Sequence, residues 1–182
     1  PASLICLDEK ENQNKFTSIA DNVRKLVFHF DILLSKIAKK YDLVILDSAP
    51  GFNYESLANF QIANGILFIT NPDYPALVAT AKAVSYAKFV DVPMGGIVLN
   101  KVTNKNYELK EDEIEKLVGA KIISQIPADK YIPESIAKGK PIVLYKKYSP
   151  ASILFKDLAA RLINENYKLN MLEILRLFLN KM

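Results

Sequence analysis

An acidic side chain, Asp47, directly follows a run of four apolar residues, Leu43–Leu46, and precedes a short turn that contains Pro50 and Gly51. A continuous apolar run of this length is typical of a strand that is buried on both faces in a parallel sheet. The acid would then lie at the carboxyl end of a core strand, where open α/β sheets bind their ligands. This is the position of a Walker B aspartate, which helps to hold the Mg²⁺ of a nucleotide. An aspartate that only caps a strand-to-loop turn is common in α/β proteins, so this segment alone leaves both interpretations open.

The sequence contains no phosphate-binding loop to accompany Asp47. The usual loop is G-x-x-x-x-G-K-[ST], whereas this sequence has six glycines and its Gly139–Lys140 pair is followed by Pro141. The sequence also starts with Pro1 rather than Met. We therefore expect either the distal part of a longer protein or a relative that has lost its phosphate site.

Length and composition fit one globular domain. The 182 residues are half apolar, which is enough for a sizeable core. A net charge of +4 without blocks of like charge does not indicate a nucleic-acid-binding protein. The single Cys6 excludes an internal disulfide and suits a reducing compartment, and no apolar stretch reaches the roughly 20 residues of a spanning helix. A cytoplasmic location is therefore expected.

Helical and strand patterns alternate along the sequence. The expected elements are a helix over 19–37, strands over 43–46, 65–70, 94–99 and 121–126, and a short edge strand over 142–145. Asp73 is expected to cap one helix and Ser149 another, which would start at Pro150. This alternation predicts an α/β fold with a three-layer, mainly parallel sheet flanked by helices.

Several short motifs, taken in order, resemble the MinD/ParA group of deviant Walker A ATPases, and most closely its archaeal MinD-like members. Asp42–Gly51 is similar to the Walker B strand and switch II turn, and Phe68–Asp73 to the next strand with its Asn-Pro-acid turn. Gly96–Lys101 is similar to the strand whose last Asn contacts adenine, and Ile126–Asp129 to the loop over the base. Ile136–Val143 and Ser149–Ala151 are similar to the segments before the last helix. The resemblance implies a P-loop NTPase-like domain over 1–167, present without its N-terminal P-loop strand, and a separate amphipathic helix over 168–182.

The resemblance also implies ATP and Mg²⁺ as cofactors and assigns the site residues. These are Asp47 as the catalytic Mg²⁺-side acid, which would hold the metal through water; Asn100, Pro127 and Asp129 around the base; and Ser48, Ala49, Pro50 and Gly51 as the switch II turn. From the residues alone, Asn100 could equally satisfy the backbone of a turn, and Asp129 could cap a helix that begins near Tyr131.

The K-G-G-x-G-K-T loop and the switch I aspartate of that family have no counterpart in this sequence. Phosphoryl transfer depends on positioning and on charge neutralisation, which the loop amides and lysines supply. We therefore expect ATP hydrolysis only if a phosphate loop lies upstream in the intact protein. These 182 residues alone are not expected to hydrolyse ATP at a useful rate.

The tail over 168–182 is strongly apolar along one side. Its expected membrane-facing residues are Leu172, Leu175, Phe178 and Leu179, with Lys168, Arg176 and Lys181 near the headgroups. The helix is too short to span a bilayer but suits the membrane interface. Docking of the same helix on its own domain or on a partner is the alternative that the residues leave open.

The function implied by the resemblance is a nucleotide-dependent spatial-positioning switch of the MinD type, at the cell division site or in a related task. ATP would drive formation of a homodimer, which would bind the inner face of the cell membrane peripherally. A regulatory protein that the sequence does not identify would control this dimer. The alternatives are a non-hydrolysing adaptor that kept the fold and a ParA-like DNA partitioning protein. The apolar tail favours membrane over nucleic acid, because DNA binding calls for more clustered Lys and Arg.

Overall fold

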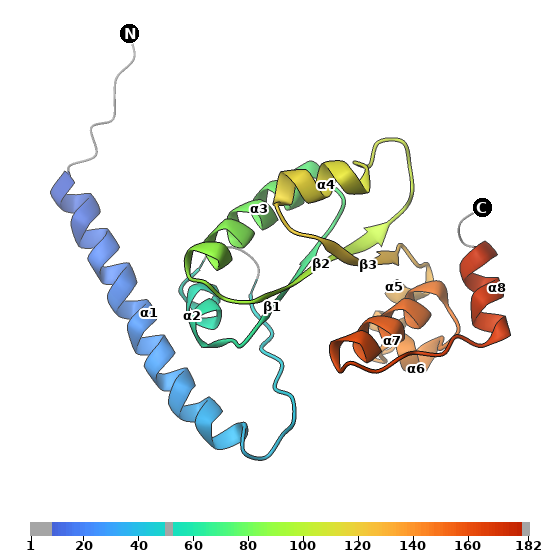
Figure 1. Ribbon diagram of the computed structural model, residues 1–182, viewed down its shortest axis with the longest axis horizontal. Helices are drawn as coiled ribbons and strands as arrows, with labels where there is room; N and C mark the ends of the chain where they lie inside the picture. The colour runs from blue at the N-terminus through green and yellow to red at the C-terminus, as the bar shows by residue number, and fades with distance from the viewer. Residues whose placement is uncertain (1–8, 50–52, 180–182) are drawn as a thin grey trace, which may run out of the picture. The chain divides into compact units, whose positions relative to one another are not determined.

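A computed structural model describes residues 9–49 and 53–179 of the chain (Figure 1). The chain divides into two compact units. Unit 1 comprises Pro1–Ile66 and Tyr86–Met94, and unit 2 comprises Leu67–Ser85 and Gly95–Met182.

Helices and strands alternate through most of the chain. In chain order they are α1 (Glu9–Ile37), α2 (Tyr54–Ile62), β1 (Ile66–Thr70), α3 (Tyr74–Phe89), β2 (Met94–Val102), α4 (Glu111–Val118), β3 (Ile122–Pro127), α5 (Tyr131–Ala137), α6 (Ile142–Tyr145), α7 (Pro150–Leu162) and α8 (Met171–Leu179). The strands form a parallel sheet in the order β1-β2-β3, and helices flank it. The predicted α/β fold is therefore confirmed.

The two predicted helix starts in unit 2 are also confirmed. The Asp73 carboxylate accepts a hydrogen bond of 3.0 Å from the backbone N–H of Ala76 at the start of α3. The Ser149 hydroxyl accepts one of 3.4 Å from the N–H of Ser152, and Pro150 is the first residue of α7. In both places a short polar side chain satisfies a backbone donor that has no partner within its own helix.

The segment Leu43–Leu46 does not form the predicted core strand. It has no regular secondary structure, and Leu43 and Ile45 are 58% and 80% exposed. A strand forms only where a neighbour takes up its backbone N–H and C=O groups, and none of the three strands in the described residues pairs with this segment. The neighbour expected from the family resemblance is the strand of the phosphate loop, which the sequence does not contain.

The predicted edge strand over 142–145 is also wrong, because these residues form the single helical turn α6. The N–H groups of Leu144 and Tyr145 donate to the Pro141 carbonyl at 3.0 and 2.9 Å, and that of Lys146 donates to Ile142 at 2.8 Å. Four apolar residues fit a strand and a buried helical turn equally well. Pro141, with φ of −54°, directs the chain into the turn.

Unit 1 holds α1 and α2, which pack against each other. Val23 of α1 and Ala58 of α2 are buried. The ring of Phe60 meets that of Tyr86 edge-on, with the centroids 5.4 Å apart. Asn53 caps α2, because its side-chain oxygen accepts the Ser56 N–H at 2.8 Å.

Unit 2 is built around the contact of α7 with the sheet. Val98 of β2 and Ile126 of β3 form a buried cluster with Ala151 and Leu158 of α7. This packing fixes the first turn of α7 beside the carboxyl ends of β2 and β3.

β2 and β3 approach each other closely at Gly96. Gly96 has φ of +113°, and a Cβ placed there would lie 2.6 Å from Cγ2 of Ile123 and 2.9 Å from the carbonyl oxygen of Lys121. The register shifts next to this point, because Ile97 and Val98 pair with Ile122 and Ser124 and leave one extra residue in β3. Only glycine fits both the backbone angle and the space.

Candidate functional site

A second irregularity in the sheet lies at Asn100. Leu99 pairs with Gln125 and Val102 with Pro127, so Asn100 and Lys101 of β2 together oppose a single residue of β3. Lys101 has φ of +59°. Such a bulge changes the direction of side chains and is common beside functional sites. Asn100 is half-buried there.

Pro127 and Asp129 follow at the end of β3. Pro127 is buried, and the N–H of Ala128 donates to the Val102 carbonyl at 2.8 Å. Asn100, Pro127 and Asp129 therefore all lie in unit 2 in the segments that end β2 and β3.

The Asp129 carboxylate is already engaged by backbone groups. One oxygen accepts the Tyr131 N–H at 2.9 Å, and the other accepts the Ala151 N–H at 3.3 Å. It therefore caps α5, as one of the two sequence interpretations expected, and it also ties the loop after β3 to the first turn of α7. Nothing in these contacts tests its role near a base.

Asp47 and the start of the predicted switch II turn lie in unit 1. Asp47, Ser48 and Ala49 are exposed. Pro50 and Gly51 lie outside the described residues. The Mg²⁺-side acid and the base-side residues thus belong to different units, and the role of each stays a prediction.

The pair Gly139–Lys140 ends a helix and does not form a phosphate loop. The N–H of Gly139 donates to the Ile136 carbonyl at 2.9 Å, and that of Lys140 donates to Ser135 at 3.0 Å. Gly139 has φ of +59°, the left-handed conformation that commonly ends helices. Both N–H groups are used within the chain and do not offer a phosphate cradle.

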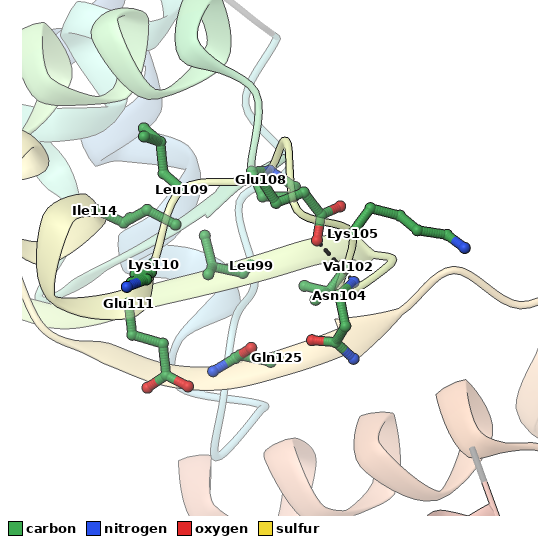
Figure 2. Close-up of a pocket in the computed structure, with 11 residues that line it drawn as sticks. Leu99, Val102, Asn104, Lys105, Glu108, Leu109, Lys110, Glu111, Ile114 and Gln125 are labelled. Atoms are coloured by element: carbon green, nitrogen blue, oxygen red, sulfur yellow. Dashed lines mark hydrogen bonds between the residues drawn. The ribbon is translucent and has the colours of Figure 1, made fainter. Parts of the chain in front are cut away.

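A cavity of about 320 Å³ opens in unit 2 between the sheet and the start of α4 (Figure 2). Its lining residues are Pro72, Leu99, Val102, Asn104, Lys105, Glu108, Leu109, Lys110, Glu111, Ile114 and Gln125. They follow or end all three strands, which is the usual ligand side of an open α/β sheet. The lining does not include Asn100, Pro127 or Asp129, and sequence reasoning did not identify this cavity.

Glu108 shapes one wall of that cavity. Its carboxylate accepts hydrogen bonds from the Thr103 N–H at 3.0 Å, the Thr103 hydroxyl at 2.7 Å and the Asn104 N–H at 2.8 Å. Figure 2 shows Glu108 beside Asn104. Because backbone donors occupy this carboxylate, it fixes the loop after β2 and is not free to receive a ligand.

The tail helix α8 is attached to unit 2 through a buried polar group. Glu173 is 2% exposed, and its carboxylate accepts hydrogen bonds from the Tyr167 hydroxyl at 2.5 Å and from the Asn170 N–H at 3.0 Å. The ammonium of Lys156 on α7 lies 3.7 Å away. In return, the Asn170 side chain accepts the Glu173 N–H at 2.9 Å. We call Glu173, Tyr167, Asn170 and Lys156 the Glu173 cluster.

Charge and burial act against each other in the Glu173 cluster. Burial alone raises the pKa of the Glu173 carboxyl, but the hydrogen bonds from Tyr167 and Asn170 and the charge of Lys156 together hold that pKa below its ordinary value. Burial, and then the hydrogen bond to Glu173, raise the pKa of Tyr167 to about 12. The cluster is therefore a carboxylate bound to a neutral phenol at neutral pH.

The apolar side of α8 faces away from the rest of unit 2. The exposed apolar residues of this helix are Met171, Leu172, Ile174, Leu175 and Leu179. Three of the four predicted membrane-facing side chains, Leu172, Leu175 and Leu179, are thus at the surface, and that of Phe178 lies outside the described residues, as does Lys181. No helix in the described ranges is long and apolar enough to cross a membrane.

Comparison with known proteins places these features in context. Residues 33–179 match the model of a family described as 4Fe-4S iron sulfur cluster binding proteins, NifH/frxC family. An uncharacterized ATP-binding protein of Methanocaldococcus jannaschii is 29% identical over 70% of this chain and 49% of its own length. An iron-sulfur cluster carrier protein of Pyrococcus horikoshii is 33% identical over 68% of this chain and 46% of its own. The chain thus spans about half the length of these relatives.

Solved structures support the same fold. The cell division ATPase MinD of Pyrococcus furiosus superposes with a TM-score of 0.68 at 24% identity, over 78% of this chain and 58% of that one. The septum site-determining protein MinD of Pyrococcus horikoshii, solved with Mg-ADP, gives 0.67 at 23% identity, over 77% and 56%. The sheet and its helices are therefore those of the MinD/ParA type, as the motifs predicted.

These relatives suggest two bound groups, an iron–sulfur cluster and a nucleotide. The described residues fit the nucleotide better than the cluster. A [4Fe–4S] cluster takes four cysteine thiolates, and this sequence has a single cysteine. In the ranges that the structure covers, no three His, Cys, Asp or Glu side chains gather to hold a metal. For a nucleotide, Asp47 offers an exposed carboxylate and Asn100 an amide at the bulge. The Gly139–Lys140 pair, the single glycine–lysine pair of the sequence, does not offer the phosphate cradle.

Proposed function

This chain belongs to the family described as 4Fe-4S iron sulfur cluster binding proteins of the NifH/frxC type, and we propose that it is part of a nucleotide-dependent positioning switch like MinD. The intact protein would bind ATP and Mg²⁺, dimerise, and attach to the inner face of the cell membrane until hydrolysis releases it. The MinD/ParA fold and the MinD relatives support the nucleotide part of this proposal. The exposed apolar face of α8 is the observation that carries the membrane part.

On the nucleotide side, this chain would supply the metal-side acid and the base contact. The Asp47 carboxylate would hold Mg²⁺ through water, and the Asn100 amide would hydrogen-bond the adenine edge. Mg²⁺ and ATP together would supply the phosphoryl chemistry. The charge of the γ-phosphate would have to be neutralised by groups outside these 182 residues, since the sequence holds no loop lysine for that task.

On the membrane side, the orientation of α8 supports an interfacial role. A helix that docks on its own domain in water normally buries its apolar side. Among the described side chains of α8 the buried one is Glu173, and the apolar residues Leu172, Leu175 and Leu179 are 51%, 56% and 61% exposed. This arrangement suits a helix whose apolar side enters the acyl region of a membrane.

Dimerisation would convert this weak contact into a switch. A single short helix binds a bilayer reversibly, whereas two helices on one dimer act through their effective concentration and bind far more strongly. ATP-driven dimerisation would therefore control membrane residence without any change in α8 itself.

Two other functions have a specific observation in their favour. A non-hydrolysing adaptor would keep this fold and its interaction surfaces without a phosphate loop. An iron–sulfur carrier fits the named relatives, but the single cysteine of this sequence does not supply a cluster site. The reading frame upstream of Pro1 separates these candidates, because a K-G-G-x-G-K-T motif there supports the switch and its absence supports the adaptor.

Co-sedimentation with liposomes tests the membrane part. We compare the intact protein with a version that ends at Tyr167 and with Leu175→Glu, each with and without ATP. The control is Leu162→Glu, which places the same charge on an apolar residue of α7 that is 49% exposed. The proposal expects loss of binding in the first two variants and retention in the control. Equal sedimentation of all four proteins refutes membrane attachment through α8.

A further inference from the structure

A second cavity, of about 280 Å³, lies beside α8 in unit 2. Tyr131, Tyr145, Lys146, Lys147, Tyr148, Ser149 and Arg176 line it. We call it the tyrosine–lysine pocket. Its lining comes from α5, from the end of α6 with the loop into α7, and from α8 through Arg176, so segments far apart in the sequence meet there.

Three positively charged side chains line the pocket, and its lining residues include no carboxylate. In the described part of the chain, no ion pair joins Lys146, Lys147 or Arg176 to an acid. The nearby Glu134 carboxylate accepts a hydrogen bond of 3.1 Å from the Tyr145 hydroxyl. A concave surface with one sign of charge concentrates its field and attracts an anion.

Aromatic rings hold the lysines in place. The Lys146 ammonium lies 5.1 Å from the ring centre of Tyr131 and 5.5 Å from that of Tyr145, and the Lys147 ammonium lies 5.5 Å from that of Tyr148. These cation–π contacts neutralise no charge, but they limit the motion of flexible side chains. The lysines are therefore ordered before a ligand arrives, which lowers the entropy cost of binding.

The same helix that closes the pocket carries the exposed apolar face. Arg176 of α8 lines the pocket, and Leu172 and Leu175 of the same helix are exposed. A phospholipid has a phosphate group and acyl chains in this same order, whereas free phosphate or a polynucleotide matches the charges alone. The volume is near the low end of the roughly 300–1,000 Å³ of small-molecule pockets, which suits a headgroup better than a nucleotide.

We propose that the tyrosine–lysine pocket binds the phosphate headgroup of an anionic phospholipid while α8 inserts its apolar face beside it. This inference rests on the proposed membrane attachment and names the lipid class that it would select. Lys146, Lys147 and Arg176 contact the phosphate, and Tyr131 and Tyr145 position Lys146.

The test measures binding of the intact protein to vesicles of phosphatidylcholine alone and of phosphatidylcholine mixed with phosphatidylglycerol. The variant is Lys146→Gln/Lys147→Gln, in which both substituted side chains are exposed. The control is Lys39→Gln/Lys40→Gln in unit 1, a neighbouring pair of lysines that is also exposed. The pocket variant should bind mixed vesicles about 30-fold more weakly, from roughly 1 kcal/mol per lysine at an anionic surface, and the control should bind like wild type. Tyr131→Leu should weaken the same preference by a smaller factor, since it frees Lys146 but removes no charge.

Three outcomes overturn the headgroup site and differ from failure of the membrane proposal. The first is equal binding of the pocket variant and its control to mixed vesicles. The second is complete competition by inorganic phosphate, which would make the pocket a site for the free ion. The third is that the pocket variant no longer binds a single-stranded oligonucleotide but still binds vesicles as well as wild type does. Wild type that sediments with neither vesicle refutes membrane attachment itself.

Discussion

Replacing Glu173 by alanine should release α8 from unit 2 while leaving the sheet intact. The carboxylate is 2% exposed and receives two hydrogen bonds in addition to the Lys156 charge. A hydrogen bond to a charged group contributes about 1.5–3 kcal/mol, and we take about 2 kcal/mol for the whole change because Lys156 remains partly hydrated. At about 1.4 kcal/mol per factor of ten, the undocked population of α8 should rise roughly 30-fold.

Amide hydrogen exchange measures this population directly. Exchange of the α8 amides should become roughly 30-fold faster in Glu173→Ala, since local opening limits their exchange, and the α7 core amides should not change. The control is Glu165→Ala, which removes the same charge from an exposed side chain in the segment between α7 and α8. Indistinguishable α8 exchange in the two variants would refute the claim that the Glu173 cluster holds the helix.

The pH dependence of α8 docking follows from the same cluster. The pKa of the Glu173 carboxyl is lowered in the docked state, so its contribution to docking is complete above the ordinary pKa of 4.5. That contribution is lost as the pH falls through the lower pKa of the docked state. The raised pKa of Tyr167, about 12 against 10.0, means that its contribution is complete below 10.0 and is lost as the pH rises toward 12. Docking should therefore be strongest between these limits. The difference in tyrosinate absorbance between wild type and Tyr167→Phe, followed as the pH rises, reports the ionisation of Tyr167. Its midpoint should lie near 12, and a midpoint near 10 would contradict the buried contact.

Further predictions concern the sheet and the nucleotide residues. Gly96→Ala should destabilise the protein by about 2–4 kcal/mol in urea unfolding, because a Cβ at this position meets close contacts and the backbone has a positive φ. The control is Gly139→Ala, whose Cβ meets nothing within 4 Å and which should therefore destabilise the protein less. Equal losses of stability in the two variants would contradict the packing argument. Asp129→Ala should cost about 1–3 kcal/mol through its two lost backbone hydrogen bonds, and an unchanged unfolding midpoint would remove its tethering role. In a form that carries a phosphate loop, Asp47→Ala should abolish Mg²⁺-dependent hydrolysis with an unchanged melting temperature, and retained turnover would exclude it as the metal-side acid. Asn100→Ala should reduce the preference for ATP over GTP, and an unchanged preference would remove Asn100 from the base contact.

Short sequence patterns predicted correctly the helix caps, which depend only on neighbouring residues, and the strands that have a partner in the sheet. Asp73 and Ser149 cap helices because short polar side chains satisfy nearby N–H groups wherever the chain continues. The strand at 65–70 and those around 94–99 and 121–126 formed because each has a neighbour in the sheet. Leu43–Leu46 has an equally good strand pattern and did not form one, because pairing depends on a second segment and not on the pattern itself.

The candidate site was predictable only in part for a similar reason. The motifs led to Asn100, Pro127 and Asp129, which the fold does place where two strands end. The bulge that sets the direction of Asn100 depends on how β2 and β3 align, and no single segment encodes that alignment. The tyrosine–lysine pocket joins residues from three helices and a loop, so it became visible only in the folded chain. The orientation of α8 could not be predicted from the sequence either. An apolar stripe does not show that the helix will be held by its polar residue Glu173 and leave the stripe exposed.

The order β1-β2-β3 in the sheet is also the order in which the strands leave the ribosome. Each of these three strands can therefore add to the edge that its predecessor has just exposed, with one helix as the connection, and none of the three has to insert between two that are already paired. Pairings between segments close in sequence form quickly, and domains fold from the N-terminus as synthesis proceeds. These three strands can thus assemble during translation in single additions.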